Sequence, residues 1–346
     1  MPEITEADTL LDGLQRALAE AEPADDAATL LQTLIQAGLD RLPLPGGGAT
    51  LQRWKALALV AGHDLSLAKL YEGHTDARAI LHEFDERDAL FSGARWGVWA
   101  SESAQGRVTL HKGESGRVRL YGTKCWCSGA DSLSHALLTA WHADGTGPQL
   151  VRVALNQGAI QVFAQAWKAV GMQGSAGVDV FFDGAMADAV GASGHYLQRP
   201  GFWHGGAGVA ACWWGGARAL AEPLFRKMQA GQAPYDPLRL AALGTVDLAL
   251  RSAALALKSA ARWIDEHPLD DAGNVALRAR LAVEASADTV LREAGRALGA
   301  PAFCRDARFA RMAADLPVFL RQSHADHDIA QLGRRVLDAG DAPWTL

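Results

Sequence analysis

The sequence contains few cysteines, and they form no recognisable cluster. Of its 346 residues only four are cysteine, and Cys125 and Cys127 are the only two that lie close together. Disulfide-stabilised domains and structural zinc sites both need cysteines that are more numerous or more regularly spaced. We therefore expect reduced thiols and no disulfide framework.

An excess of positive charge and long apolar runs are also missing. The chain has 33 Lys and Arg against 39 Asp and Glu, a net charge of -6, and no basic run with interleaved aromatics. A protein that follows a phosphate backbone needs such a run. The N-terminus carries acids where a secretory signal carries Lys or Arg, and no segment has about 18 uninterrupted apolar residues. We expect a cytoplasmic protein that binds neither nucleic acid nor membrane.

Hydrophobic periodicity divides the chain into three parts. Apolar residues recur three and four apart up to about residue 84, alternate with polar ones in short runs from 95 to 191, and return to the helical period after Pro200. The pattern predicts a mainly α protein with a central β-domain. Its three parts are an N-terminal helical domain (1–92), a small β-barrel or sandwich (93–198) and a C-terminal four-helix bundle (199–346).

Individual elements follow from the same pattern. The third N-terminal helix is expected over residues 51–71. The expected strands are 95–101, 107–113, 117–128, 135–141, 149–155, 160–166 and 178–182. The expected bundle helices are 208–228, 237–265, 274–299 and 319–337.

Several stretches, in the right order, resemble the acyl-CoA dehydrogenase superfamily, which includes acyl-CoA oxidases, nitroalkane oxidase and a group of flavin-dependent monooxygenases. The stretches are GHDLSLAKLYEGHTDA (62–77), WASES (99–103), GTKCWCSGAD (122–131), WKAVGMQGSAGVDVFFDGAMA (167–187) and CRDARFARM (304–312). The resemblance implies a flavoprotein that binds FAD, with FMN as the less expected cofactor and loss of the flavin as an alternative.

The stretch around Trp126 carries the sharpest part of the resemblance. Residues two apart on a strand share a face, so Trp126 and Ser128 should point one way, and Cys125 and Cys127 the other. The resemblance implies that Trp126 packs beside the flavin ring and that Ser128 hydrogen-bonds near its N5 atom. The alternative is that Trp126 belongs to the core.

Ser101 and Glu102 lie where the family has a Thr-Glu loop that binds the flavin pyrimidine. The glycine-serine run that usually follows that loop is missing here. The resemblance therefore implies a cofactor role for both residues, and a surface turn is the alternative.

The family's catalytic carboxylate is the clearest departure. Dehydrogenation of an acyl thioester needs a Glu to remove the α-proton, in one of two places. The place before the last helix falls near Gln322, which cannot accept that proton and which we assign to the substrate pocket. The other place, in the first bundle helix (WHGGAGVAACWWGG), holds no acid. The nearest replacements are His324, Asp326 and Asp328, and a histidine is a residue type that can act as a base near neutral pH.

The residues expected at the cofactor's far end and around the substrate are less distinctive. The family's adenine-dinucleotide motifs are absent, and Arg292 and Arg296 are the candidates for pyrophosphate contacts. His74 and His204 are candidates for the substrate pocket, with a structural role as the alternative for each. His324 and Asp326 share a short segment with a second histidine, but no third ligand is identifiable, so we predict no metal site.

Three functions remain open at this stage. The first is a flavin-dependent oxidoreductase that acts on an acyl thioester or a related small acyl substrate with an altered base. The second is a flavin-dependent monooxygenase of the same fold, and the third is a catalytically degenerate protein that binds flavin or an acyl carrier. In this architecture the bundle helices join subunits, so the apolar segment 237–257 predicts a homodimer or homotetramer.

Overall fold

The computed structural model describes residues 6–22, 25–145, 147–164, 167–175, 177–231, 236–340 and 344. The chain divides into two compact units. The first unit comprises residues 1–42 and 66–202, and the second comprises residues 43–65 and 203–346. The first therefore joins the sheet to most of the N-terminal helices, while one N-terminal helix belongs with the C-terminal ones.

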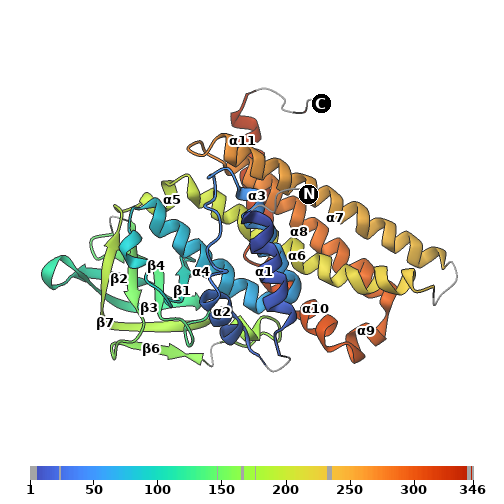
Figure 1. Cartoon of the computed structure of the whole chain (residues 1–346). Helices are drawn as coiled ribbons and strands as arrows, with labels where there is room; N and C mark the ends of the chain where they lie inside the picture. Colours follow the sequence, from blue (N-terminus) through green and yellow to red (C-terminus); the bar gives the residue numbers. More distant parts are fainter. Residues whose placement is uncertain are drawn as a thin grey trace. The chain divides into compact units, whose positions relative to one another are not determined.

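The first unit is built on a small sheet, and every one of its seven expected strands is confirmed (Figure 1). The strands are β1 (Trp96–Trp99), β2 (Val108–Lys112), β3 (Val118–Cys127), β4 (His135–His142), β5 (Pro148–Ala154), β6 (Ile160–Phe163) and β7 (Val178–Val190). Pairing runs β4–β2–β3–β7–β5 and returns to β4, so these five strands close into a barrel. Strand β1 adds to β4, and β6 adds to β7.

Strand β7 shows why the sequence forms this barrel. Its residues alternate between buried and more exposed positions, as a strand with one face in a core requires. The pairing with β3 shifts at Gly184, which has a φ of 84° and lies beside the ring of Tyr121. Glycine adopts this conformation without strain, and the resulting bulge bends a long strand around the barrel.

The first unit also contains helices. They are α1 (Glu6–Ala19), α2 (Ala27–Gln36), α4 (Leu65–Glu83), the short α5 (His195–Gln198) and the 3-10 turn η1 (Arg87–Ala89). Of these, α4 and α5 pack on this sheet. Ile80 and Leu81 of α4 are fully buried in one cluster with Trp96, Leu137 and Tyr196. This cluster ties α4 to β1 and β4.

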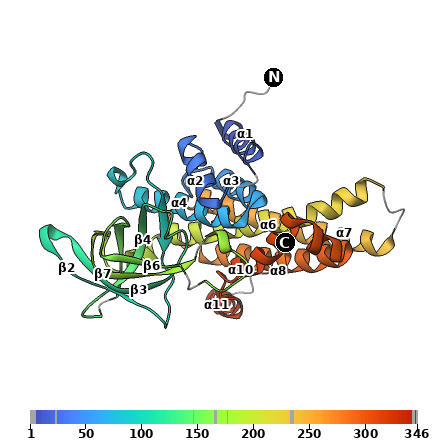
Figure 2. The same ribbon diagram turned by 90° about the horizontal axis from the view of Figure 1, so that it is seen from below.

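The second unit is a set of long helices. They are α3 (Thr50–His63), α6 (Gly201–Gln229), α7 (Pro237–Glu266), α8 (Gly273–Leu298), α9 (Ala300–Arg305), α10 (Ala307–Leu320) and α11 (Asp326–Asp338). Helices α6, α7 and α8 run side by side in both views (Figures 1 and 2). The predicted fold class, mainly α with a central β-domain and a C-terminal bundle, is confirmed.

Two expected helices were predicted too long. Residues 51–71 form α3 and α4, because Asp64 adopts an extended conformation (φ -153°, ψ 133°) and ends the first helix. Residues 319–337 contain the end of α10, a turn and α11, because Ala325 has φ 45° and ψ -116°, outside the helical region. Neither break coincides with a proline or glycine, the usual sequence signals.

The glycine-rich start of α6 serves close helix packing. Gly215 lies directly against the backbone carbonyl of Ala58 in α3, where a Cβ would collide with the oxygen, and Gly208 faces the ring of Trp54. Small residues let two helix backbones approach closely. This glycine-rich stretch, which contains no acid, therefore serves helix packing in the second unit.

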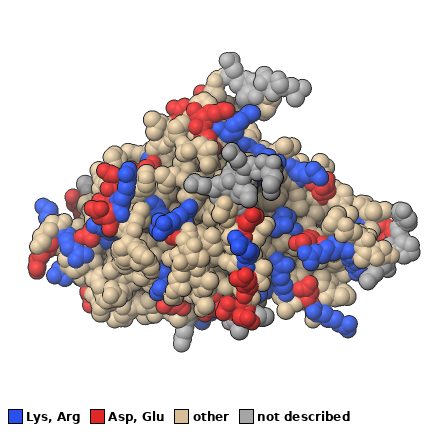
Figure 3. All heavy atoms as spheres, in the orientation of Figure 1, with Lys and Arg blue, Asp and Glu red and all other residues tan. Residues whose placement is uncertain are grey.

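Helix α7 keeps much of its apolar surface exposed. Leu238, Leu248 and Leu255 are 80%, 69% and 66% exposed. By length and composition alone this helix is apolar enough to cross a membrane, and 22% of its most apolar stretch is buried. The sequence analysis required an uninterrupted apolar run and did not identify this helix, because Asp247 and Arg251 interrupt its run. On the face drawn in Figure 3, acidic and basic side chains are interspersed.

Candidate functional site

Trp126 lies at the end of β3 with its side chain in solvent. It has a φ of 63° and is 54% exposed, whereas Cys125 and Cys127 are 4% and 0% exposed. The predicted opposition between Trp126 and the two cysteines is therefore seen, and Trp126 is not a core residue. The strand period from which we predicted a shared face for Trp126 and Ser128 does not extend to Ser128, because β3 is bulged between Lys124 and Cys127 and ends at Cys127.

Among the described residues, the ring of Trp126 has one recorded ring contact. Trp167 packs against it edge to face, with ring centroids 6.4 Å apart, and the Trp167 Nε1–H donates to the carbonyl of Gly171 at 3.1 Å. The carbonyl of Ser128 accepts from Trp99 Nε1 at 3.1 Å, which fixes the chain after the bulge. The result is an anchored aromatic ring whose remaining surface is open to a planar ligand.

Glu102 fastens its loop to the barrel. Its carboxylate accepts hydrogen bonds from Thr139 Oγ1 at 2.6 Å, Lys124 Nζ at 3.0 Å and Trp141 Nε1 at 3.0 Å. Burial opposes ionisation of Glu102, but the bonds from Thr139 and Trp141 and the charge of Lys124 outweigh it and lower its pKa. Ser101, beside it, is exposed. Glu102 is thus bound to the barrel through three side chains, and Ser101 remains open.

His74 is a structural residue, which corrects its assignment to the substrate pocket. It is fully buried, and its Nε2 bonds Asp40 at 3.0 Å. Its Nδ1 accepts the backbone N–H of Trp96 at 3.1 Å. Burial lowers the pKa of His74 despite Asp40, consistent with a neutral ring. Both ring nitrogens join parts of the fold, so neither remains for a substrate.

The other candidates in the second unit are scattered. His204 on α6 is 2% exposed and lies against Gly46. Arg292 and Arg296 lie on α8 with side chains 58% and 74% exposed, and both pair with Glu293, at 2.9 and 3.5 Å. The structure does not bring these three residues together with the turn between α10 and α11 through any contact it records among described residues.

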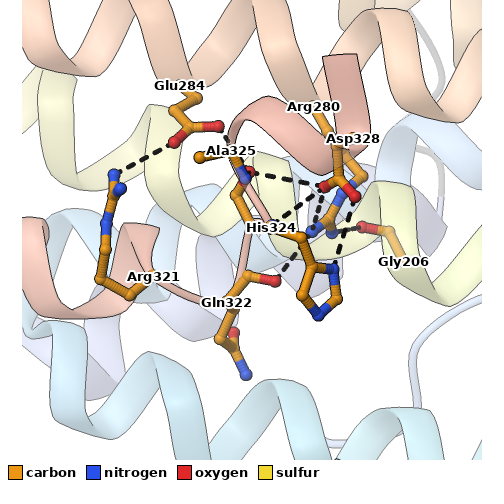
Figure 4. Close-up of polar contacts among 9 residues, drawn as sticks. Gly206, Arg280, Glu284, Arg321, Gln322, His324, Ala325 and Asp328 are labelled. Atoms are coloured by element: carbon orange, nitrogen blue, oxygen red, sulfur yellow. Dashed lines mark hydrogen bonds and ion pairs between the residues drawn. The ribbon is translucent and has the colours of Figure 1, made fainter. Parts of the chain in front are cut away.

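That turn is held by buried charges (Figure 4). Arg280 of α8 donates to the carbonyl of Gly206 at 2.6 Å and to that of Gln322 at 3.1 Å, and it lies 4.0 Å from the Asp328 carboxylate. Its guanidinium also stacks over Trp213, 4.9 Å from the ring centroid. Arg280 is 8% exposed. It therefore connects α6, α8 and the turn.

Asp328 and His324 form a pair at this turn. One carboxylate oxygen of Asp328 accepts the backbone N–H of His324 at 3.2 Å, and the other lies 3.4 Å from His324 Nδ1. Asp328 is buried, whereas the His324 side chain is 77% exposed. A buried carboxylate that holds an exposed imidazole through Nδ1 leaves Nε2 available to exchange a proton.

Glu284 is the buried acid that sequence reasoning missed. It lies on α8, 8% exposed, and accepts from Ser323 Oγ at 2.6 Å and from Arg321 at 3.0 Å. The one sequence signal is its spacing, one helical turn after Arg280, which places both on the same face of α8. The carboxylate is bonded on both oxygens.

The remaining predicted residues lie at the rim of this turn. Asp326 is exposed in the first turn of α11, where a negative charge is favourable. Gln322 is exposed, and its side chain points away from the two carboxylates (Figure 4). Among the residues that the structure describes, no group of three or more His, Cys, Asp or Glu is arranged to hold a metal ion.

The chain resembles known proteins in structure, although no known sequence family matches it. No protein-family model matches the chain, and no curated protein matches it in sequence. Solved structures match over almost the whole length. KijD3, bound to FMN and a dTDP-linked sugar, is 18% identical, with 99% of this chain and 96% of that chain covered and a TM-score of 0.81. The dibenzothiophene monooxygenase TdsC of Paenibacillus sp. A11-2 is 20% identical, with 98% and 97% covered and a TM-score of 0.77.

A nitrososynthase from Micromonospora carbonacea var. africana is 17% identical, with 96% and 97% covered and a TM-score of 0.80. The chain has the acyl-CoA dehydrogenase fold. The resemblance read from the motifs is confirmed at the level of the fold.

Proposed function

We propose that the chain is a flavin-dependent oxidoreductase that uses FMN and oxygenates a small organic substrate. The proposal reverses the order of cofactors expected from the sequence, where FAD came first. KijD3 and TdsC, which share the fold, have been solved with FMN. The absence of adenine-dinucleotide motifs and the pairing of Arg292 and Arg296 with Glu293 also favour the shorter cofactor.

The first unit offers a fit for the flavin ring. Trp126 is 54% exposed, and the ring of Trp167 stands at 89° to its indole with the ring centroids 6.4 Å apart. A half-exposed, anchored tryptophan is unusual on a free surface and is well matched to a planar aromatic ligand. We assign Trp126 as the surface on which the isoalloxazine would stack.

The choice of oxygenation rests on one observation, the state of the acids at the α10–α11 turn. The amide of Gln322 cannot remove an α-proton. The two buried carboxylates nearby, Glu284 and Asp328, already accept hydrogen bonds from Ser323, Arg321 and His324. A general base for acyl-CoA dehydrogenation must be poised at the substrate carbon. Oxygen activation would come from reduced FMN when it is bound, and that chemistry would not require such a base.

The residues of the chain would position the substrate and move a proton. Asp328 holds the His324 ring through Nδ1, and the exposed Nε2 side can donate a proton to a group beside the turn. Arg280 stabilises the turn by donating hydrogen bonds to the carbonyl of Gln322, in the turn, and to that of Gly206, in α6. His324 is thus the proposed proton donor, and Asp328 and Arg280 are positioning residues.

Titration of the purified protein with FMN and with FAD tests the cofactor assignment. We expect FMN to bind in the micromolar range, with a dissociation constant about tenfold or more below that of FAD. The His324→Ala variant should bind FMN as the wild type does, because His324 acts on the substrate and not on the cofactor. Equal or tighter binding of FAD would contradict the choice of FMN. No binding of either flavin would contradict the proposed function.

We also propose that a second copy of the chain covers the apolar face of α7, giving a dimer or tetramer. Leu248 and Leu255 are seven residues apart and therefore lie on one side of the helix. Light scattering should give at least twice the monomer mass for the wild type and a smaller mass for the Leu248→Glu/Leu255→Glu variant. Leu269→Glu, at a site 83% exposed outside the helix, is the control. A monomeric wild type, or one that partitions into lipid vesicles, contradicts the proposal.

A further inference from the structure

Three arginines gather at the C-terminal end of α3 in the second unit. Arg308 of α10 donates a hydrogen bond to the carbonyl of Gly62, and an Nη nitrogen of Arg218, on α6, lies 2.8 Å from the position that a Cβ at residue 62 would occupy. Arg311, three residues after Arg308, has its Nε 3.8 Å from the carboxylate of Asp64. Two guanidinium groups from different helices therefore lie against one glycine, with a third beside them.

These arginines carry more positive charge than the recorded acids neutralise. Asp64 pairs with Arg311. Among the described residues, neither Arg218 nor Arg308 has an ion pair. Asp306, the nearest acid to Arg308 in sequence, caps the start of α10 by accepting a backbone N–H. The whole chain has a net charge of -6, so this end of α3 is a local excess of positive charge in an acidic protein.

Capping of α3 accounts for only one of the arginines. The last carbonyls of a helix lack intrahelical donors, and positive charge is favourable beside them. The Asp64 N–H bonds the carbonyl of Val60 at 3.1 Å, and Arg308 bonds that of Gly62. Arg218 has no recorded hydrogen bond among the described residues. Its charge is therefore not explained by the end of the helix.

The guanidinium groups are accessible from solvent and close to one another. The Arg311 side chain is 65% exposed, Arg308 is exposed and Arg218 is half-buried. Burial lowers the pKa of the neighbouring His63, the charge of Asp64 raises it, and the charges of the two α10 arginines lower it. Two separate arginines thus act on one imidazole, and an anion that reached them would meet both.

We propose that Arg218, Arg308 and Arg311 form a binding site for a tetrahedral oxyanion, of which phosphate and phosphate monoesters are the common forms. A guanidinium presents a planar fork of donors that matches the oxygens of a phosphate. A tetrahedral ion directs oxygens toward guanidinium groups on different helices, whereas the two oxygens of a carboxylate lie in one plane and suit a single fork. The site belongs to the second unit and Trp126 to the first, so the proposal does not depend on the flavin.

Inorganic phosphate is the probe, because it carries the recognised group and nothing else, and acetate is the comparison ligand with a flat carboxylate. The melting temperature of the protein without added flavin is followed up to about 20 mM of each anion, with sodium chloride holding the ionic strength constant. We expect a saturable rise with phosphate, half complete near about 1 mM, and about tenfold weaker binding of acetate. The general stabilising effect of phosphate on proteins does not saturate in this range.

Variants then locate the site. Arg218→Met should weaken phosphate binding about 10-fold to 100-fold, the effect of losing one charge-assisted hydrogen bond. This variant is decisive because Arg218 caps no helix, whereas Arg308→Met also removes a donor from the end of α3. Arg334→Met is the control, since Arg334 is an exposed arginine of α11 without an ion pair among the described residues. Its phosphate affinity should equal that of the wild type.

Four results would overturn the proposal. Phosphate could act no differently from sodium chloride at equal ionic strength, acetate could bind as tightly as phosphate, or Arg218→Met could leave the phosphate affinity unchanged. The fourth is competition of phosphate with FMN but not with riboflavin, which lacks the phosphate, because the site would then belong to the cofactor. Phosphate binding by a protein that binds no flavin would leave this site standing and remove the proposed function.

Discussion

The end of β3 and the turn between α10 and α11 each contain a non-glycine residue with positive φ, and they are stabilised in different ways. Trp126 has φ 63° and Ala325 has φ 45°. Such residues cost free energy and persist where their surroundings hold them, commonly at functional sites. Beside Trp126, the buried thiols of Cys125 and Cys127 anchor the strand and the aromatic ring stays exposed.

Around Ala325 the support is electrostatic instead. Ser323 Oγ accepts the backbone N–H of Ala325 at 3.1 Å, and Glu284, Arg280 and Asp328 surround that serine and its neighbours. The first region offers a flat apolar surface to a ring. The second offers a fixed polar frame around an exposed histidine. One chain thus contains a surface suited to a cofactor and another suited to proton transfer.

The largest expected effect is the removal of the charge that supports the second region. Arg280→Met leaves Asp328 without its buried cation and two carbonyls without their donor, so the free energy of unfolding should fall by about 3 kcal/mol. Chemical denaturation measures this loss. Arg278→Met, on an exposed position of the same helix, should stay within about 0.5 kcal/mol of the wild type. A similar small change for Arg280→Met would show that the frame does not depend on charge.

Removing the aromatic ring from the first region should affect ligand binding and leave stability nearly unchanged. Trp126→Ala should raise the dissociation constant for FMN about 10-fold to 100-fold, because stacking on an aromatic side chain is worth about 1–3 kcal/mol. Quenching of flavin fluorescence gives the affinity, and thermal melting gives the stability. Phe225→Ala, at an aromatic residue 52% exposed on α6, is the control and should not alter the affinity. Unchanged FMN binding by Trp126→Ala would remove the assigned surface.

Backbone strain at the second region predicts a smaller effect of opposite sign. Ala325→Gly should stabilise the protein by about 1 kcal/mol, because glycine adopts φ 45° and ψ -116° without the steric cost of a Cβ. Denaturation midpoints for Ala325→Gly and for Ala330→Gly, inside α11, test this. The second substitution should destabilise, since glycine weakens a helix interior. Destabilisation by Ala325→Gly as well would show that the turn is not strained.

The smallest effect concerns the hydrogen-bonded carboxylate of Glu102, on the loop that is fastened to the barrel. The pKa of Glu102 lies below its ordinary value of 4.5, so the ionised form favours folding. Its contribution is present above about pH 4.5 and is lost as the pH falls through the folded-state pKa. The stability of Glu102→Gln, measured against pH, should therefore decline less between pH 5 and pH 3 than that of the wild type. Parallel curves for the two proteins would contradict the role of Glu102.

The sequence predicted the fold well and the second region poorly, for physical reasons. Each strand carries its own alternation, so all seven were found, and the burial of Cys125 and Cys127 opposite Trp126 followed from the same period. The bulge that displaces Ser128 depends on pairing with β7, which a local pattern does not contain.

The charges at the α10–α11 turn were harder to foresee. Arg280 and Glu284 are more than 35 residues away in sequence from the turn that they hold, and each resembles an ordinary surface charge of an amphipathic helix. The helix period also runs through Ala325, so the turn itself was missed. His74 illustrates the same limit, since its partners Asp40 and Trp96 come from distant segments.

The most direct test of the account is anaerobic mixing of the FMN-loaded protein with a panel of saturated acyl-CoA thioesters, followed by the flavin absorbance near ~450 nm. A well-placed general base contributes about 10²–10⁴-fold to removal of the α-proton, and the acids near Gln322 are already bonded. We predict that the flavin stays oxidised, or loses its colour far more slowly than a dehydrogenase would require. Rapid bleaching by any of these thioesters would contradict the proposal that this chain oxygenates its substrate.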